Sequence, residues 1–121
     1  MPVRGIRGAT VSADNTPEAI LTATRELIEE IAIKNPTLVP EDISSIIFTV
    51  TDDLTTTYPA KAARELGWTS TPLMCAVEIP VPGSLSKCIR ALLHWNTALP
   101  QSSIRHIYLK EAASLRPDLT N

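Results

Sequence analysis

The sequence predicts a mixed α/β sheet that carries its helices on one face, within a single domain covering residues 1–121. Residues 88–95 show a period-two alternation of side chains, which is typical of a β-strand. Residues 20–31 repeat apolar side chains every three to four positions, which is typical of an amphipathic helix. Segments of these kinds follow one another as strand, long helix, strand, short helix and three strands. The apolar fraction of 44% includes only five aromatic residues, so the core is expected to be aliphatic.

The first strand is predicted at residues 2–12. Gly5 and Gly8 weaken it as a strand but let another backbone or a ligand approach closely. Arg7 lies between them with little bulk beside it. It is therefore either an ordinary solvated arginine or a binding residue.

Two helices are predicted on either side of a central strand. The long helix spans residues 16–34 and ends where Asn35 precedes a proline. The short helix spans residues 58–67, with a proline at its start and a glycine at its end. Lys61 and Arg64 lie three positions apart on one face of this short helix, close to the end where the backbone also favours anions.

Residues 45–51 are rich in β-branched side chains and are predicted to form a central strand. The polar loop at 51–57 follows the end of that strand, which is a common place for binding groups. Asp52 and Asp53 lie in this loop without another carboxylate or histidine at metal-ligand spacing. Turn and capping roles are therefore favoured over a metal site.

The stretch from Leu73 to Leu93 organises the rest of the chain. It begins as an apolar strand that ends at Glu78, breaks at prolines and a glycine, and resumes as a strand that carries Arg90. A guanidinium in an apolar strand is costly unless an anion neutralises it. Either Glu78 is that anion in an internal salt bridge, or both residues await a ligand.

A last strand is predicted at residues 104–109, with Tyr108 on the face opposite its two neighbours. One helical turn at 111–115 and a tail at 116–119 follow it.

Composition argues against several functional classes. The net charge of −2 and the pI near 5.6 oppose a general role on nucleic acids or membrane surfaces. The sequence contains no apolar run of transmembrane length and no signal-peptide pattern. Cys75 and Cys88 form neither a CxxC pair nor a disulfide ladder, so a cytoplasmic, reducing setting is expected.

The usual catalytic patterns are missing from the sequence. The two histidines, His94 and His106, fit no triad and no zinc site, and no glycine-rich loop suits a nucleotide cofactor. The thiol of Cys75 lies in an apolar strand, where cysteine is more often an inert core residue than a nucleophile. What remains is a set of cations with a few hydrogen-bonding groups: Arg7, Lys61, Arg64, Arg90 and Arg116 with Cys75, Glu78 and Tyr108. This set suits a small dianionic substrate and a reaction that needs electrostatic stabilisation.

Several separate segments resemble the monofunctional AroH-class chorismate mutases. They are RGIRGAT at 4–10, TYPAKAARELGW at 57–68, CxxE at 75–78, GSLSKCIR at 83–90, and IRHIYLKEA with LRPDL at 104–119. The match is collinear over nearly the whole chain. The resemblance implies a homotrimer with a pseudo-α/β-barrel core and an active site in each cleft between subunits. It also implies a Claisen rearrangement of chorismate to prephenate, on the route to phenylalanine and tyrosine, without metal or cofactor.

The resemblance also implies a role for each matching residue. Arg90 would hold a carboxylate and donate to the ether oxygen, Arg7 would bind a carboxylate, and Tyr108 would contact the enolpyruvyl side. Glu78 and the backbone and thiol of Cys75 would take the ring hydroxyl. The cleft would be lined by Tyr58, Ala60, Leu73, Met74 and Leu115. Lys61, Arg64 and Arg116 would attract the dianion and help the tail close over it.

Two departures from the family pattern bear on substrate affinity. Tyr58 stands where the family has phenylalanine, and Met74 replaces a smaller polar residue. Two other functions are alternatives to the mutase. A trimeric imine deaminase has a similar architecture but needs a water-activating arrangement that the sequence lacks. A non-catalytic protein that binds aromatic metabolites would tolerate loss of Arg90 or Glu78, and both are present.

Overall fold

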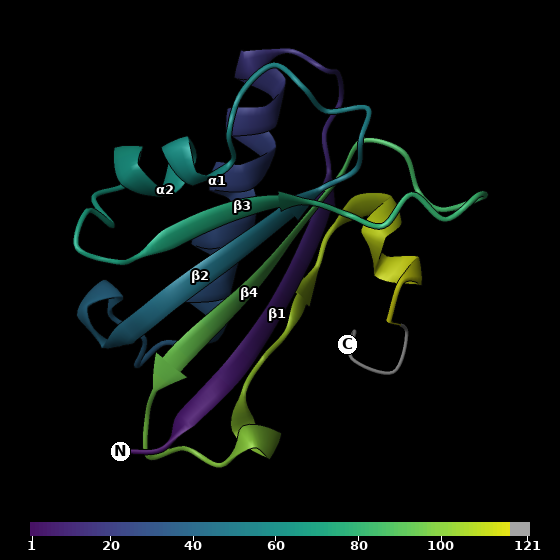
Figure 1. Cartoon of the computed structure of the whole chain (residues 1–121). Coiled ribbons are helices and arrows are strands. Elements are labelled where there is room, and N and C mark those ends of the chain that lie inside the picture. The colour runs from purple at the N-terminus through teal and green to yellow at the C-terminus, as the bar shows by residue number, and fades with distance from the viewer. Residues whose placement is uncertain (117–121) are drawn as a thin grey trace.

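Five strands form one mixed sheet in the order β3-β2-β4-β1-β5 in the computed structural model, which describes residues 1–116 (Figure 1). The strands are β1 (Val3–Val11), β2 (Ile43–Val50), β3 (Leu73–Val77), β4 (Cys88–Asn96) and β5 (Ile107–Tyr108). Strand β4 is antiparallel to both β1 and β2, whereas β5 is parallel to β1 and β3 is parallel to β2. The predicted mixed sheet is confirmed.

Both α-helices lie on the same side of this sheet, as the sequence predicts (Figure 1). They are α1 (Pro17–Lys34) and α2 (Ala60–Glu65). Three short 3-10 helices complete the chain: η1 (Pro40–Asp42), η2 (Gln101–Ser103) and η3 (Lys110–Ser114). Within residues 1–116, no helix combines the length and apolar character needed to cross a membrane.

Helix α1 begins and ends at residues whose side chains replace missing backbone partners. Thr16 Oγ1 accepts a hydrogen bond from the Ala19 N–H at 3.2 Å, the usual role of an N-cap threonine. At the other end, the buried Asn35 side chain donates to the Ile31 carbonyl at 2.9 Å. The same side chain donates to the Arg105 carbonyl and accepts from the Arg105 N–H, both at 3.0 Å. Asn35 thus joins the end of α1 to the segment that enters β5.

The aliphatic core lies between α1 and the sheet. Period-two alternation places Ile6, Leu93 and Ile46 side by side on the face toward the helices, and all three are buried. Gly8 is on the same face, where an added Cβ would lie 2.9 Å from Ile31 Cδ1. Gly8 therefore permits close packing of α1 against the sheet and not the approach of a ligand.

The last strand is shorter than the predicted 104–109, because side chains cover part of the outer edge of β1. The Gly5 N–H donates to Gln101 Oε1 at 3.0 Å, and Gln101 Nε2 donates back to the Gly5 carbonyl at 2.7 Å. The Arg7 N–H donates to His106 Nδ1 at 2.9 Å. Only at Gly8 and Ala9 does β5 itself pair with β1. Hydrogen bonds from side chains carry no period-two signal, so the pattern alone overstated the strand.

Candidate active site

The sheet face opposite α1 carries the charged residues that the sequence singled out. Arg90 on β4 lies opposite Ala9 of β1 and Thr49 of β2. Arg7 lies opposite Leu92, two residues further along β4, and is therefore a diagonal neighbour of Arg90 on the same face. The register thus brings two cations together from strands that are far apart in the sequence.

Glu78 joins this group from the chain just after β3. Its carboxylate Oε2 lies 3.4 Å from Arg90 Nε and accepts a hydrogen bond from Thr49 Oγ1 at 2.7 Å. The side chains of Arg90 and Glu78 keep only 26% and 24% of their surface exposed, which makes the ion pair half-buried. Arg90 Nε nevertheless has no hydrogen-bond acceptor within residues 1–116. Glu78 therefore neutralises Arg90 by charge at 3.4 Å and not through a hydrogen bond to the buried Nε.

A hollow of about 290 Å³ lies over this group. It is lined by Arg7, Ile47, Thr49, Glu78, Arg90, Ala91 and Leu92. Small-molecule sites usually measure about 300–1,000 Å³ and bury most of their ligand. A hollow of this size on an exposed sheet face fits one wall of a site better than a complete site.

A second hollow, of about 390 Å³, contains two further predicted residues on the other side of the sheet edge. Tyr58 and Cys75 line it, together with the loop at 54–57. Cys75 pairs with Phe48, so it lies on the helix-covered face, whereas Glu78 and Arg90 lie on the opposite face. Within one chain, the structure does not bring Cys75 to the Glu78 carboxylate.

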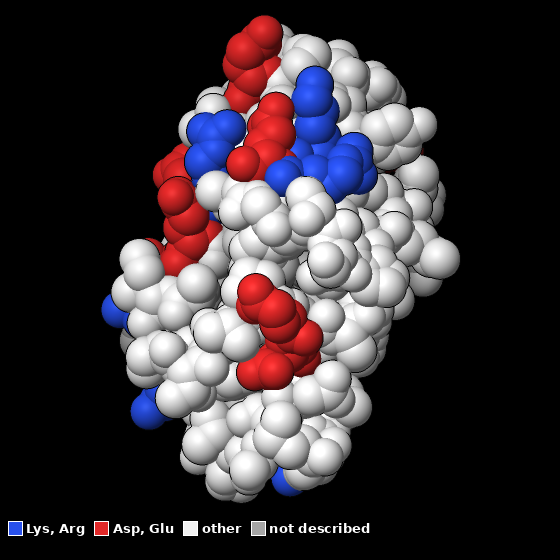
Figure 2. Space-filling view, turned by 90° about the vertical axis from the view of Figure 1, so that its left-hand side faces the viewer, with Lys and Arg blue, Asp and Glu red and all other residues white. Residues whose placement is uncertain are grey.

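The remaining residues expected on the Cys75 side gather around α2. Lys61 and Arg64 are exposed on this short helix, and Ala60 is buried at its start. On the side of the molecule that carries α2, Lys and Arg side chains form a group with acidic side chains beside it (Figure 2). The neighbouring strand β3 presents Leu73, half-buried against the core. Met74, which is 64% exposed, pairs with Ile47 and therefore lies on the opposite face, with Arg90.

The residues expected on the Arg90 side gather where η3 meets β1. Tyr108 is buried and pairs with Ala9, which places it on the same sheet face as Arg90, as predicted. Leu115 packs against the same small cluster. The Arg116 guanidinium is one of the charges that lower the pKa of His106. The tail at 117–119, which the sequence suggested as a closing segment, lies outside the described residues.

The start of β4 is held by the aspartate for which a capping role was favoured. Both carboxylate oxygens of Asp53 accept from the Lys87 N–H, at 3.1 and 2.9 Å, and Lys87 has a positive φ of 52°. Burial alone would raise the pKa of Asp53, but hydrogen bonds from Thr51 and Lys87 outweigh it and lower that pKa. Residues 1–116 contain no cluster of three or more metal-ligating side chains. The capping interpretation of Asp53 is confirmed.

Sequence reasoning missed two residues beside Arg90. Thr49 was read only as part of a central strand, although its period-two position places it on the open face beside Arg90. Cys88 lies two residues before Arg90 and is buried. Burial raises the pKa of the Cys88 thiol, and the Arg90 guanidinium opposes this shift only in part. The thiol therefore stays protonated at neutral pH. The only sequence feature that could have placed Cys88 beside Arg90 is their separation by two positions along one strand.

Comparison with known proteins shows the family to which this chain belongs. The family model for chorismate mutase type I matches residues 3–119. The chain is 53% identical over 117 residues to chorismate mutase AroH of Thermus thermophilus, covering 97% of this chain and 96% of that protein. It is 46% identical over 121 residues to chorismate mutase AroH of Bacillus subtilis (strain 168), covering 99% and 94%.

A solved structure agrees with these sequences. The chorismate mutase from Clostridium thermocellum superposes with a TM-score of 0.88 at 54% sequence identity, covering 91% of this chain and 97% of that one. Sequence identity of about half over nearly the full length shows that the chain shares both the fold and the family of these proteins. The chain therefore belongs to the type I chorismate mutases.

Proposed function

We propose that this chain, as a single-domain subunit of a homotrimer, converts chorismate to prephenate at clefts between subunits, without a cofactor. The isomerase class and the role in aromatic amino-acid biosynthesis follow from membership of the family and from the identity to curated chorismate mutases. The division of the site between subunits and the role of each residue are our own assignments. A cytoplasmic location belongs to the same proposal, since Cys75 and Cys88 are both free thiols.

The observation that carries the mechanism is the half-buried Arg90, which lines the hollow beside its ion-pair partner Glu78. When the C–O bond of chorismate breaks, negative charge grows on the ether oxygen and partial positive charge grows on the ring. A donor aimed at that oxygen stabilises the transition state more than the substrate, which raises kcat. Arg90 is placed to donate in this way, and Glu78 beside it to accept the ring hydroxyl and face the positive ring.

The reaction is intramolecular and concerted, so it needs no general acid, general base or nucleophile. Even the low end of enzymatic acceleration corresponds to about 8 kcal/mol of barrier lowering. In this site that amount has to come from holding the reactive conformer and from charges fixed in advance. Arg7, on the strand next to Arg90, is suited to anchoring one of the two substrate carboxylates.

The sheet itself is the reason for a shared site. The Cys75 thiol and the Arg90 guanidinium lie on opposite faces of the sheet, so we infer that these two side chains meet the substrate from different subunits. We assign one wall to one subunit: Arg7, Met74, Glu78, Arg90, Tyr108, Leu115 and Arg116. The other wall would come from its neighbour: Tyr58, Ala60, Lys61, Arg64, Leu73 and Cys75.

Exposed apolar side chains support an assembly of this kind. Val77, at the end of β3, is 66% exposed, and Ile79 and Val81, in the segment just after it, are 74% and 58% exposed. Ile47 and Leu92 are more than one-third exposed on the open sheet face. Side chains of this type at such density usually mark a contact with another chain.

The first test follows the loss of chorismate absorbance with purified protein in EDTA. Saturable conversion to prephenate supports the activity, whereas a folded trimer that binds chorismate without converting it would indicate a binding protein.

The shared site is tested by co-expressing the Arg90→Ala and Arg64→Ala variants with different affinity tags. If each is inactive alone, mixed trimers should regain about one third of wild-type activity, since one of the three sites in every mixed trimer then combines two intact walls. No recovery in purified mixed trimers would place both residues in a site within one chain.

A further inference from the structure

The imidazole of His106 takes the place of a strand partner for β1. The Arg7 N–H donates to His106 Nδ1 at 2.9 Å, one position before β5 begins to pair at Gly8. A neutral imidazole that accepts at Nδ1 carries its proton on Nε2. The side chain therefore satisfies a backbone donor that would otherwise have no partner from β5.

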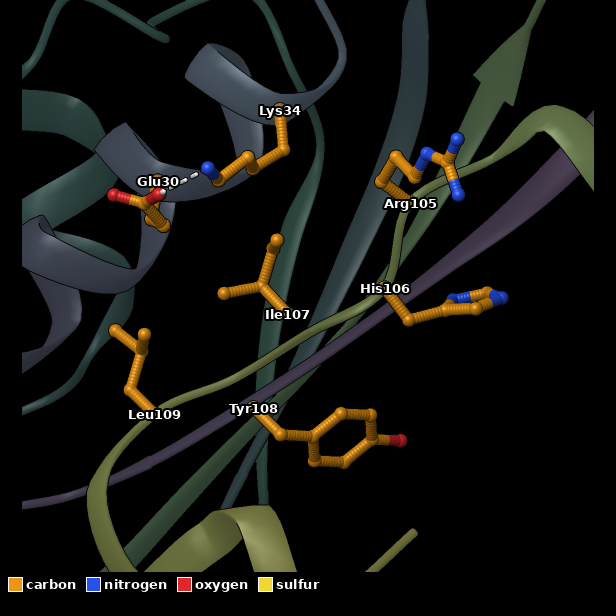
Figure 3. Close-up of a pocket in the computed structure, with 7 residues that line it drawn as sticks. All are labelled: Glu30, Lys34, Arg105, His106, Ile107, Tyr108 and Leu109. Atoms are coloured by element: carbon orange, nitrogen blue, oxygen red, sulfur yellow. Dashed lines mark ion pairs between the residues drawn. The ribbon is translucent and has the colours of Figure 1, made fainter. Parts of the chain in front are cut away.

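The backbone that carries His106 is held from the opposite side. Both backbone polar groups of the preceding Arg105 bind the side chain of the buried Asn35 at the end of α1, each at 3.0 Å. In Figure 3, His106 and Tyr108 point to the same side of the segment, while Ile107 points toward α1. The imidazole thus lies on the Arg7 side of a segment that α1 fixes in position.

The charges that face His106 are mostly positive. Arg7 on β1 and Arg116 after η3 both act on it, and with burial, the largest cause, they lower the pKa of His106 below its usual 6.5. On α1, Glu30 and Lys34 line a hollow of about 310 Å³ together with His106, but these two side chains pair with each other at 3.7 Å. The neutral imidazole is therefore the form present at pH 7 and above.

We propose that His106 is a positioning residue for Arg7, and that only its neutral form holds this part of β1 where the Arg7 side chain can bind a substrate carboxylate. A protonated imidazole has a donor at both nitrogens, so it faces the Arg7 N–H with a second N–H and the bond is lost. It also adds a third positive charge beside Arg7 and Arg116. The inference rests on the proposed function, because it assigns the consequence to carboxylate binding.

The direction of the pH dependence follows from the lowered pKa. His106 loses its proton more easily in the folded state than in the unfolded state. Its neutral form therefore contributes its full stabilisation of the fold above the unfolded pKa, about 6.5. That contribution is lost as the pH falls through the lower pKa of the folded state. Substrate affinity should fall over the same range, whereas kcat should change little because β1 lies between the strand that carries Arg90 and the segment that carries His106.

Two variants and the wild type test this, each assayed with chorismate from pH 5.5 to 8. His106→Asn keeps an acceptor near the Nδ1 position but cannot titrate, so its KM should stay within about twofold of wild type at pH 8 and remain flat with pH. His106→Leu removes the acceptor, so its KM should rise about five- to tenfold at every pH with kcat nearly unchanged. Wild type should approach the His106→Leu value at the acidic end.

Gln101→Leu is the matched control. Gln101 makes the same kind of contact with β1, to the N–H of Gly5 two residues before Arg7, and it is exposed. Its loss should lower the free energy of unfolding about as much as the loss of the His106 contact, yet leave KM and its pH profile at wild-type values. If Gln101→Leu raises KM as His106→Leu does, the effect belongs to the strand edge in general and the positioning role is wrong.

A titration by NMR separates this inference from the proposed function, because it needs no turnover. The His106 Nε2–H tautomer should be seen at pH 8, and the Arg7 amide resonance should move with the His106 titration in wild type and stay fixed in His106→Asn. An Arg7 amide that ignores this titration would overturn the inference even in an active enzyme. A protein that shows the titration but converts no chorismate would overturn the proposed function alone.

Discussion

At the scale of single residues, Arg90 combines a half-buried position in the wall of the hollow with a carboxylate partner that neutralises its charge. Replacing Arg90 with citrulline keeps the shape and removes the charge. We expect kcat to fall by about 10²- to 10³-fold and KM to rise by much less, since the charge stabilises the transition state more than the substrate. Steady-state kinetics on semisynthetic protein measures this. Equal losses in kcat and affinity would mean that Arg90 only anchors a carboxylate.

Thr49 acts on the same site through Glu78. Its hydroxyl donates to the carboxylate at 2.7 Å, which fixes the side-chain rotamer that faces Arg90. Thr49→Val keeps the volume and removes the donor, so kcat/KM should fall about three- to tenfold, the size of one hydrogen bond to a charged group that solvent partly replaces. Thr49→Ser retains the donor and should stay within about twofold of wild type. Wild-type kinetics in Thr49→Val would show that Glu78 needs no support from β2.

At the scale of elements, the approach of α1 to the sheet depends on Gly8. An added Cβ would lie 2.9 Å from Ile31 Cδ1 and 3.2 Å from Leu27 Cδ1, both in the core. Gly8→Ala should therefore destabilise the fold by about 1–3 kcal/mol through overpacking. Gly5→Ala is the matched control, because its Cβ would meet only Leu92 Cδ1 at 3.8 Å. Urea unfolding measures both, and equal stabilities would contradict this account of Gly8.

At the scale of the whole molecule, the exposed apolar segment after β3 is expected to be buried in the trimer. Ile79 is 74% exposed in the single chain, so Ile79→Asp should leave the fold intact and weaken assembly. Light scattering after size exclusion should show smaller species, with specific activity that recovers as protein concentration rises. Ile33→Asp is the control, because Ile33 is 66% exposed on α1, far in sequence from every proposed contact. A trimer that survives Ile79→Asp and dissociates in Ile33→Asp would reverse the assignment of the interface.

Features at these three scales differ in how well the sequence predicts them. Alternation along 88–95 was enough to place Arg90 on one face and Leu93 on the other, and the structure agrees. The positions of Tyr108 and of both helices were also correct. The length of β5 was wrong, because His106 and Gln101 cover β1 with side chains, which leave no periodic pattern.

The sequence by itself determined the family, the mixed sheet with helices on one face, and the inventory of cations with a single paired carboxylate. These follow from local patterns and from long matching segments, both of which are properties of the chain taken in order. Only the tertiary structure decided that Arg7 and Arg90 are diagonal neighbours on one sheet face and that Thr49 and His106 support the charged residues. Those facts depend on strand register and on contacts between segments tens of residues apart, and neither leaves a periodic trace in the sequence.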